Sequence, residues 1–532
     1  MFFQSTFAQK KHMLVNVYGA KCVGIDAMTV TVEVDIRSGI GIHLVGLADT
    51  AVKESLLRTV NALQALDYHI PGKKIVINLA PADMHKSGSC YDLPIALGII
   101  AASEQKTMPV LGEFVIMGEL GLDGSVRDVS GALPVAQMAG MHGYRGCILP
   151  IQSALEAVEL REMEVYGIKT IDDAIRILSG EGNVSDLLIW NTREYHELQE
   201  EMALMQDCMA DAIDFSEIIG QESAKRGVEI AAAGGHNVAL IGSPGSGKSS
   251  LAKAMAGILP PMSREESLVT SKIYSVAGRG KLRYGLIRQR PVRSPHYSAS
   301  VAALIGGGNG DNILPGEVSL AQSGLLFLDE FGQMSRTAIE ALRGPLEDRK
   351  VVISRLRAKV EYPASFMLVA ASNPCPCGYF GEGDRCNCSV GQRTAYLSHL
   401  SGPILDRIDI QLVMRRVDTG RMLSRHEAES SAVVAERVRK ARDIQQKRFE
   451  GEGISTNAEM NNRQIARFCQ LSDECRETLQ NIIERMQLSM RAFYRIIKVS
   501  RTIADLDGRK DIEVGDILEA ASYRILDREY PM

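Results

Sequence analysis

The feature that most constrains this chain is the loop at residues 242–249, which reads Gly-Ser-Pro-Gly-Ser-Gly-Lys-Ser. An apolar run ends at Ile241, and a helical pattern follows over 250–258. This is the strand–loop–helix setting that a phosphate-binding loop needs. Its glycines let backbone N–H groups face phosphates, and the helix N-terminus adds partial positive charge. A chance Gly/Ser loop would need neither the Lys-Ser pair nor these flanks, so the sequence predicts an ATP site in an α/β module.

The loop pattern assigns a role to each kind of side chain. Lys248 is expected to reach the β- and γ-phosphates, and Ser249 is expected to ligate Mg²⁺. The residues expected to bind the nucleotide are Gly242, Ser243, Pro244, Gly245, Ser246, Gly247, Lys248, Ser249 and Ser250.

Three later segments offer the remaining groups for hydrolysis. The apolar run 325–328 ends in Asp329 and Glu330, which could hold the Mg²⁺ shell and polarise the attacking water. A third strand, 366–371, precedes Asn373, which could sense the γ-phosphate or form a turn before a proline. Arg407, beside a short helix, is either a surface ion-pair residue or an arginine finger that serves a neighbouring subunit.

The chain has 532 residues, too many for one core. We divide it into an α/β domain at 1–180, a Glu-, Asp- and Met-rich linker at 181–214, the ATPase module at 215–420, and a helical region at 421–532. In the first domain we expect strands at 30–36, 74–79, 112–120 and 146–150 and a helix at 92–102. No apolar stretch is long enough to span a membrane, and residues 1–10 lack the pattern of a signal peptide, so a cytoplasmic location is expected.

A basic window stands out in this net acidic chain, whose formal charge is −5. Residues 267–310 hold seven cations, three tyrosines and no acidic residue. This favours nucleic-acid contact over a solvated basic face. A hairpin with a cationic tip is predicted at 349–361, either as a plain surface hairpin or as one that projects into a channel. The expected DNA contacts are Arg288, Arg290, Arg293, Arg355 and Arg357.

Four of the ten cysteines fall within fourteen residues, as two Cys-x-Cys pairs. Four thiolates in a Gly/Asp-rich loop can close a tetrahedral Zn²⁺ site, although one intervening residue is tighter than the usual spacing. The alternative is a set of reduced loop cysteines, and the paired pattern favours a structural metal. The candidate ligands are Cys375, Cys377, Cys386 and Cys388.

In their order, these motifs resemble the AAA+ ATPases of the magnesium-chelatase-like branch, most closely its YifB/ComM group. Further landmarks of the resemblance are 219–221, 315–321, 373–378 and 402–408. The resemblance implies an AAA+ P-loop module with a parallel sheet and a C-terminal helical lid. It implies a hexameric ring, ATP hydrolysis and, for ComM, DNA branch migration during natural transformation. It also places Asn373 at the sensor-1 position, Arg407 at the finger position and Arg491 at sensor 2, with Arg495 as competitor.

The N-terminal domain is similar to the proteolytic domain of Lon proteases, with 80–90 at the position of the nucleophile loop. Cys90 or Ser89 would align with the catalytic serine, but the activating lysine falls near Leu133, which has no base to offer. Lys53 and Lys86 are possible substitutes that nothing in the sequence places. We expect an inactive binding or assembly module.

Three functions are compatible with these observations. The first is a DNA-remodelling motor, and the second is a magnesium-chelatase ATPase subunit, against which the Lon-like domain and the cysteine loop argue. The third is a scaffold whose ring regulates a protease. DNA-stimulated ATPase activity separates the first from the others.

Overall fold

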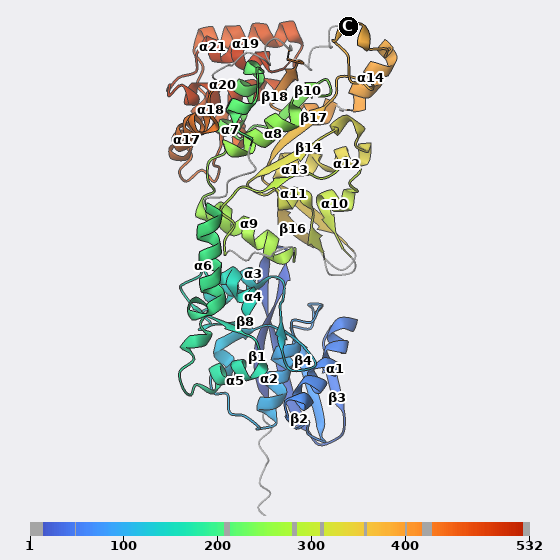
Figure 1. Cartoon of the computed structure of the whole chain (residues 1–532), viewed down its shortest axis with the longest axis vertical. Helices are drawn as coiled ribbons and strands as arrows, with labels where there is room; N and C mark the ends of the chain where they lie inside the picture. Colours follow the sequence, from blue (N-terminus) through green and yellow to red (C-terminus); the bar gives the residue numbers. More distant parts are fainter. Residues whose placement is uncertain are drawn as a thin grey trace, which may run out of the picture.

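The computed structural model describes residues 14–47, 49–206, 213–278, 285–308, 313–355, 359–399, 402–417 and 428–524. The molecule is elongated, with the N-terminal domain at one end and, at the other, the ATPase module with the helical region beside it (Figure 1). Among the described residues, no helix combines the length and the apolar character that crossing a bilayer requires.

The N-terminal domain is built on a mixed seven-stranded sheet in the order β3-β4-β2-β1-β5-β8-β9. Every second residue of β4 is buried, as expected for a strand with one face on a core. The predicted strands at 30–36, 74–79 and 146–150 and the helix at 92–102 are all present. The strands are β1 Val15–Val23, β2 Asp26–Arg37, β3 Ile42–Val45, β4 Lys74–Ala80, β5 Phe114–Ile116, β8 Gly146–Pro150 and β9 Glu164–Ile168.

Two predictions for this part need correction. The segment 112–120 is not one strand, because a 3-10 turn (Leu111–Glu113) precedes β5, and the short β6 (Glu119–Leu120) pairs with β7 (Val126–Arg127) instead. The start of the linker belongs to the domain, because Ile189 and Leu198 are buried in its core. Trp190 donates from Nε1 to the carbonyl oxygen of Val158 at 2.9 Å. From there, α6 (Arg193–Gln206) runs toward the ATPase module (Figure 1).

The ATPase module contains a five-stranded sheet in the order β11-β14-β17-β10-β18, in which every pairing is parallel. The carboxyl ends of its strands therefore lie along one edge, where ligands of open α/β sheets bind. The predicted hairpin is also present, with β15 (Lys350–Ser354) and β16 (Lys359–Pro363) antiparallel. The sheet strands are β10 Val238–Gly242, β11 Val292–Arg293, β14 Leu325–Leu328, β17 Met367–Ser372 and β18 Ile410–Met414.

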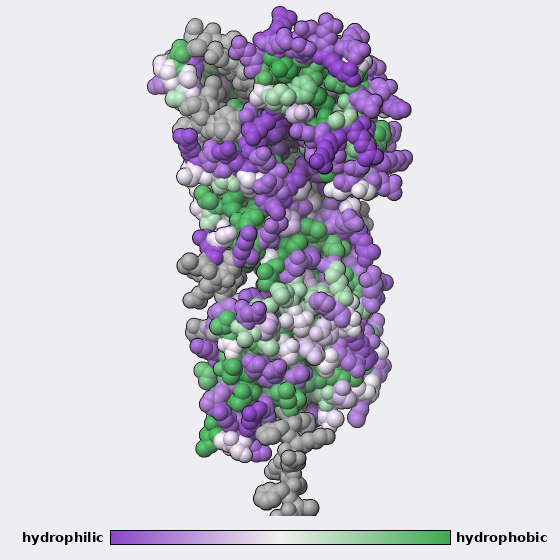
Figure 2. Space-filling model, turned by 180° about the vertical axis from the view of Figure 1, so that it is seen from behind, coloured by the Kyte–Doolittle hydropathy of each residue, from purple (hydrophilic) through white to green (hydrophobic). Residues whose placement is uncertain are grey.

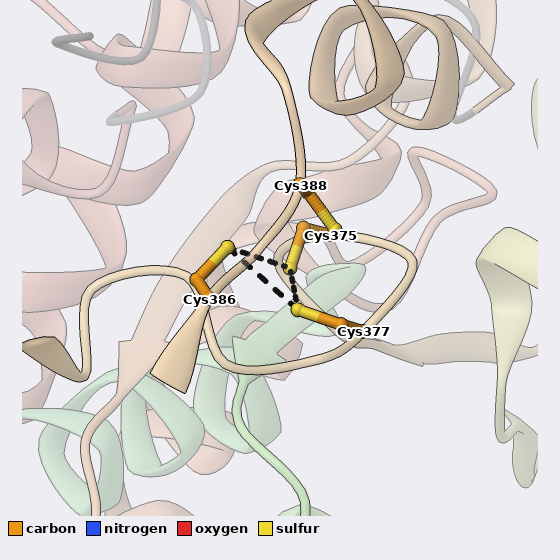
Figure 3. Close-up of side chains that lie close together, drawn as sticks. All are labelled: Cys375, Cys377, Cys386 and Cys388. Atoms are coloured by element: carbon orange, nitrogen blue, oxygen red, sulfur yellow. Dashed lines mark hydrogen bonds between the residues drawn. The ribbon is translucent and has the colours of Figure 1, made fainter. Parts of the chain in front are cut away.

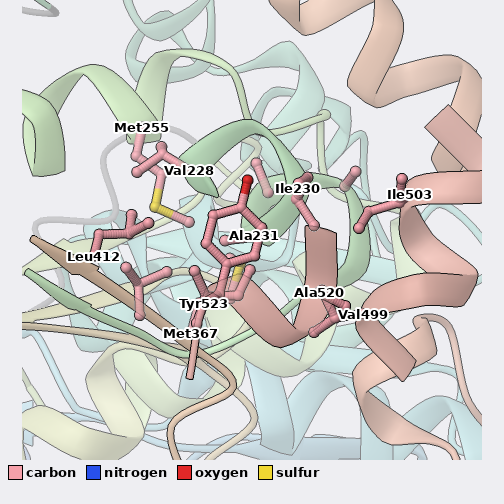
Figure 4. Packing of buried hydrophobic residues seen from close by; sticks show 14 of the residues in the cluster. Val228, Ile230, Ala231, Met255, Met367, Leu412, Val499, Ile503, Ala520 and Tyr523 are labelled. Atoms are coloured by element: carbon pink, nitrogen blue, oxygen red, sulfur yellow. The ribbon is translucent and has the colours of Figure 1, made fainter. Parts of the chain in front are cut away.

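The helical region packs directly on the ATPase module. Its main helices are α17 (Ser431–Arg448), α19 (Asp473–Met486), α20 (Met490–Leu506) and α21 (Val514–Ser522). Apolar side chains of these helices join those of α7 (Glu222–Gly234), α8 (Lys248–Gly257) and one face of the sheet in a single cluster, which includes Val228, Leu412 and Ile503 (Figure 4). A separate cluster covers the other face of the sheet, around Ile241 and Leu326.

The N-terminal domain meets the ATPase module through α9 (Arg264–Val276) and the hairpin. Lys272 on α9 pairs with Asp26 at 2.9 Å, and the backbone N–H of Gly131 donates to the carbonyl oxygen of Ser275 at 3.1 Å. Gly24, in the β1–β2 turn at φ +65°, lies so close to the hairpin that a Cβ there would stand 2.7 Å from the carbonyl oxygen of Glu361. On the face opposite to that of Figure 1, hydrophilic side chains cover most of the C-terminal end (Figure 2).

Candidate nucleotide-binding site

The phosphate-binding loop lies between β10 and α8 and closes on a buried lysine. Lys248 is 9% exposed, and its Nζ donates to the carbonyl oxygens of Gly242 at 2.7 Å and Ser243 at 3.0 Å. It also donates to Oδ1 of Asn373 at 3.2 Å. Three neighbouring parallel strands therefore bring the loop, the Asp329–Glu330 pair and Asn373 to one edge of the sheet.

The expected Mg²⁺ ligands also lie together. Ser249 donates from Oγ to Oδ2 of Asp329 at 2.9 Å, although 80 residues separate them in the chain. The other carboxylate oxygen of Asp329 accepts from the backbone N–H of Glu330 at 2.9 Å, and Glu330 adopts a left-handed φ of +50°. Hydroxyl and carboxylate oxygens at this spacing are the hard ligands that Mg²⁺ takes beside a nucleotide.

The electrostatics of the loop suit an anionic ligand. Burial lowers the pKa of Lys248, while the charges of Asp329 and Glu330 act in the opposite direction. The backbone around it is left-handed at Gly245 (φ +79°) and Gly247 (φ +89°), where a side chain would be strained. The Oγ of Ser246 is buried without a hydrogen-bond partner in the described structure. The loop can accept phosphate oxygens.

Arg407 and Arg491 lie elsewhere, around the amino ends of β10, β17 and β18. Both line a cleft of about 710 Å³ whose described lining includes no residue of the loop 242–249. Arg407 is 6% exposed and pairs with Glu347, a residue that sequence reasoning missed. Arg491 is exposed and lies 3.9 Å from Asp406.

Arg495, named above as the competitor of Arg491, is held in a buried network instead. It pairs with Asp409, which also accepts from the backbone N–H of Asn237 at 3.0 Å and lies 3.6 Å from His236. Burial alone would raise the pKa of Asp409, but Arg495 and His236 outweigh it and hold that pKa well below its usual range. His236 contacts Thr502 on α20 at 2.8 Å, so this network ties the amino edge of the sheet to the helical region.

The four cysteines of the loop after β17 converge, as Figure 3 shows. All four sulfurs lie within 4.8 Å of one another. The separations between three of them are 3.3, 3.7 and 3.8 Å, close to the ~3.8 Å between sulfurs of a tetrahedral zinc site with Zn–S bonds of ~2.3 Å. The backbone N–H of Tyr379 lowers the pKa of Cys377 to about 6. The donor set fits a thiophilic cation.

The same loop covers the phosphate-binding loop. Glu382 accepts a hydrogen bond from Oγ of Ser243, 139 residues away in the sequence. At Gly378 (φ +86°), a Cβ would lie 2.9 Å from the ring of Pro244. Sequence reasoning missed Glu382 because nothing in a Gly/Asp-rich loop indicates which distant segment it will cover.

The basic window is largely neutralised by carboxylates from outside it. Its described cations all form ion pairs: Lys272 with Asp26, Arg288 with Glu159, Arg290 with Glu266 and Arg293 with Glu317. Arg290 also donates to backbone carbonyls of Pro260 and Ser323. Arg290 and Arg293 therefore face carboxylates of the same molecule, Glu266 and Glu317, in the described structure. Arg279, Lys281 and Arg283 lie outside the described residues.

The hairpin presents a different surface. Its inner side chains Val351, Ile353 and Tyr362 are buried in the core, while Arg355 is exposed near its tip. Arg357 lies outside the described residues.

The Lon-like loop between β4 and α2 holds no comparable set of charges. Cys90 is half-buried beside a cavity of about 440 Å³ between the domains, and burial raises its pKa to about 12. Leu133 is fully buried. Lys86 is buried too, but its Nζ donates to the carbonyl oxygen of Pro81. Ser89 donates to Glu119. None of the hydrogen bonds of the described residues joins Ser89 or Cys90 to a lysine amine, so the Ser–Lys arrangement of Lon is not present there.

Comparison with known proteins agrees with this architecture. Models of "Magnesium chelatase, subunit ChlI", of "Subunit ChlI of Mg-chelatase" and of the ChlI C-terminal region match residues 214–422, 32–153 and 428–524. The chain is 40% identical to the uncharacterized protein YifB of Salmonella typhimurium and 40% identical to the competence protein ComM of Haemophilus influenzae. Each match covers 97% of this chain and 98% of the relative.

A more distant match concerns a shorter segment. The chain is 24% identical to the archaeal Lon protease of Methanocaldococcus jannaschii over 144 residues, which are 27% of this chain and 22% of that protein. The three family models and the two full-length relatives make the assignment: the chain belongs to the magnesium-chelatase-like family of AAA+ proteins, in the group that contains YifB and ComM.

Proposed function

We propose that this protein is an ATP-driven motor that acts on DNA and promotes branch migration. The observation that carries the ATPase part is the meeting of Lys248, the Ser249–Asp329 pair and Asn373 at one edge of the parallel sheet. In this assignment Lys248 binds the β- and γ-phosphates, and Ser249 and Asp329 hold Mg²⁺. Glu330 polarises the attacking water, and Asn373 senses the γ-phosphate.

The positions of two arginines support a ring. Arg407 and Arg491 line a cleft at the amino edge of the sheet, whereas the phosphate-binding loop is at the carboxyl edge. We assign both arginines to the nucleotide of a neighbouring subunit, with six subunits closing the ring. Mass measurement of the assembled protein with Mg·ATP tests this assignment, and a monomer at all concentrations contradicts it.

The DNA part is supported by the name of the competence protein ComM and by the exposed side chain of Arg355 near the tip of the hairpin. We assign the DNA contact to Arg355 and Arg357, with Arg288 at its margin. Arg290 and Arg293 are left out because they form ion pairs within the molecule. Arg355→Ala should lower the salt dependence of DNA binding by about 1 unit. Arg439→Ala, on the exposed face of α17, is the control.

The deciding experiment measures ATP hydrolysis with no DNA, with single-stranded DNA and with a branched junction. Stimulation by DNA, strongest with the junction, is expected. The name of the matching family, magnesium chelatase, supports a second candidate function. In that function the protein would be an ATPase subunit for Mg²⁺ insertion into a porphyrin. Hydrolysis that no DNA changes would favour that candidate or the regulation of a protease partner.

The cysteine loop is proposed to hold one structural Zn²⁺. The sulfur separations and the number of thiols support it, and four protein ligands leave no open position for catalysis. Metal analysis should find about one Zn²⁺ per chain, and little in a Cys375→Ser/Cys386→Ser variant. Protein prepared without chelator that holds no zinc would contradict this assignment.

A further inference from the structure

The cysteine loop (374–388) and the residue just before it contact the phosphate-binding loop at three points. The loop begins after Asn373, which accepts a hydrogen bond from Lys248. Gly378 packs on the ring of Pro244 with no room for a side chain, and Glu382 accepts from Ser243. One segment of the cysteine loop therefore covers the part of the P-loop that precedes the lysine.

Glu382 brings a negative charge to this place. Its side chain is 20% exposed, and the cation nearest to it among the described residues is Arg385 at 3.7 Å, which is itself 60% exposed. An exposed guanidinium at this distance neutralises a carboxylate only weakly. The ammonium of Lys248 does not replace it, because it donates to two carbonyl oxygens and to Asn373.

A carboxylate at Ser243 and a triphosphate in the loop have the same sign of charge. The backbone N–H groups and Lys248 are arranged for phosphate oxygens, so the anion of the ligand would come close to the carboxylate of Glu382. Two like charges that both lie next to the phosphate-binding loop, in a partly buried site, repel each other substantially. The two anions compete for the same positive environment.

We propose that Glu382 is an internal competitor of the nucleotide: it occupies the entrance of the P-loop when the site is empty and must leave when Mg·ATP binds. Cys377 and Cys386 lie on either side of Glu382, so a metal bound by the four thiols fixes the segment that presents its carboxylate. This inference rests on the proposed ATP site and assigns Glu382 as a positioning residue rather than a catalytic one.

The cysteine segment continues into α14 (Val390–His399), which begins two residues after Cys388. Tyr396 of α14 lies 3.3 Å, oxygen to oxygen, from Ser372 at the end of β17. The cysteine segment is therefore anchored at its far end as well, at the carboxyl end of β17.

The test is the binding of Mg·ATP and Mg·ADP, measured by calorimetry in a Glu330→Gln background that slows hydrolysis. Glu382→Gln keeps the shape of the side chain and removes its charge, so it should tighten ATP binding by about 10-fold and ADP binding by less. Glu265→Gln, which removes an exposed charge of the same module on α9, should change neither. Unchanged or weaker ATP binding in Glu382→Gln would overturn the proposal.

A double-mutant comparison tests the part played by the metal. In the Cys375→Ser/Cys386→Ser protein the carboxylate is no longer held, so adding Glu382→Gln should change ATP binding by much less than in the parent. An equal gain in both backgrounds would overturn the role of the metal but not that of Glu382.

The outcomes separate this inference from the proposed function. Failure of the parent protein to bind any nucleotide would contradict the ATP site itself. A parent that hydrolyses ATP, with Glu382→Gln binding it equally well, would contradict only the inference.

Discussion

Two loops in this molecule follow a buried strand and lead into a helix: 242–249 between β10 and α8, and 81–91 between β4 and α2. Each encloses a lysine that is at most 9% exposed and whose pKa is lowered by burial. Lys248 faces the amide of Asn373 and the charges of Asp329 and Glu330, whereas Lys86 donates to a backbone carbonyl oxygen. A buried charge becomes a site only where other strands bring complementary groups to it.

The difference between the two loops can be tested by making the same substitution in each. Lys248→Met should lower ATP hydrolysis by about 10³-fold, since it removes the cation that faces the transferred phosphate. Lys86→Met replaces a buried lysine by a residue of similar length, and it should leave the ATPase rate per folded molecule unchanged. A comparable loss in both variants, with thermal unfolding also unchanged, would contradict the division between an active and an inactive loop.

The cysteine thiols near these two loops, Cys377 and Cys90, differ in their pKa. Cys377 has a pKa of about 6, so at pH 8 in chelator-treated protein it is mostly thiolate, whereas the pKa of about 12 leaves Cys90 protonated. Alkylation of Cys377 by iodoacetamide should be at least about 10²-fold faster. The rate at Cys377 should fall as the pH is lowered through 6. Mass spectrometry can measure the rate of alkylation at each cysteine. Rapid alkylation of Cys90 in the folded protein would make Cys90 a candidate nucleophile again.

The assignment between subunits can be tested with two defective proteins. Glu330→Gln should slow hydrolysis by about 10²-fold by removing the carboxylate that polarises water. Arg407→Ala should keep ATP binding and slow hydrolysis at the neighbouring site. Mixed rings contain interfaces with an intact Glu330 on one side and an intact Arg407 on the other, so part of the activity should return. Stably mixed rings without any recovery would remove Arg407 from that role.

The smallest effect concerns a buried acid in the N-terminal domain. Burial raises the pKa of Glu156 to about 7, despite its hydrogen bonds with Ser275 on α9 and the backbone of Leu133. The folded state therefore binds the proton more tightly than the unfolded one. Stability should fall as the pH rises from about 4.5 to about 7, by up to about 3 kcal/mol. Glu156→Gln should flatten this dependence in thermal unfolding, and an unchanged profile would contradict the pKa.

The sequence predicted best where a pattern is local. The strand–loop–helix around Lys248 and the helix 92–102 depend on neighbouring residues, and both are present. The positions of Arg407 and Glu382 depend on which strand ends and loops meet, and no local pattern encodes that. The basic window shows the same limit, because its compensating carboxylates, such as Asp26 and Glu159, lie in a different domain.

The shared cluster of Figure 4 has a consequence for local unfolding. Since α7, α17, α20 and α21 bury their side chains in the same core as one face of the sheet, none of them can open without exposing the others. Their backbone amides should exchange with deuterium as one cooperative unit, although 196 residues lie between the end of α7 and the start of α17. The helices between 431 and 522 are in this sense part of the core of the ATPase module rather than an appendage to it.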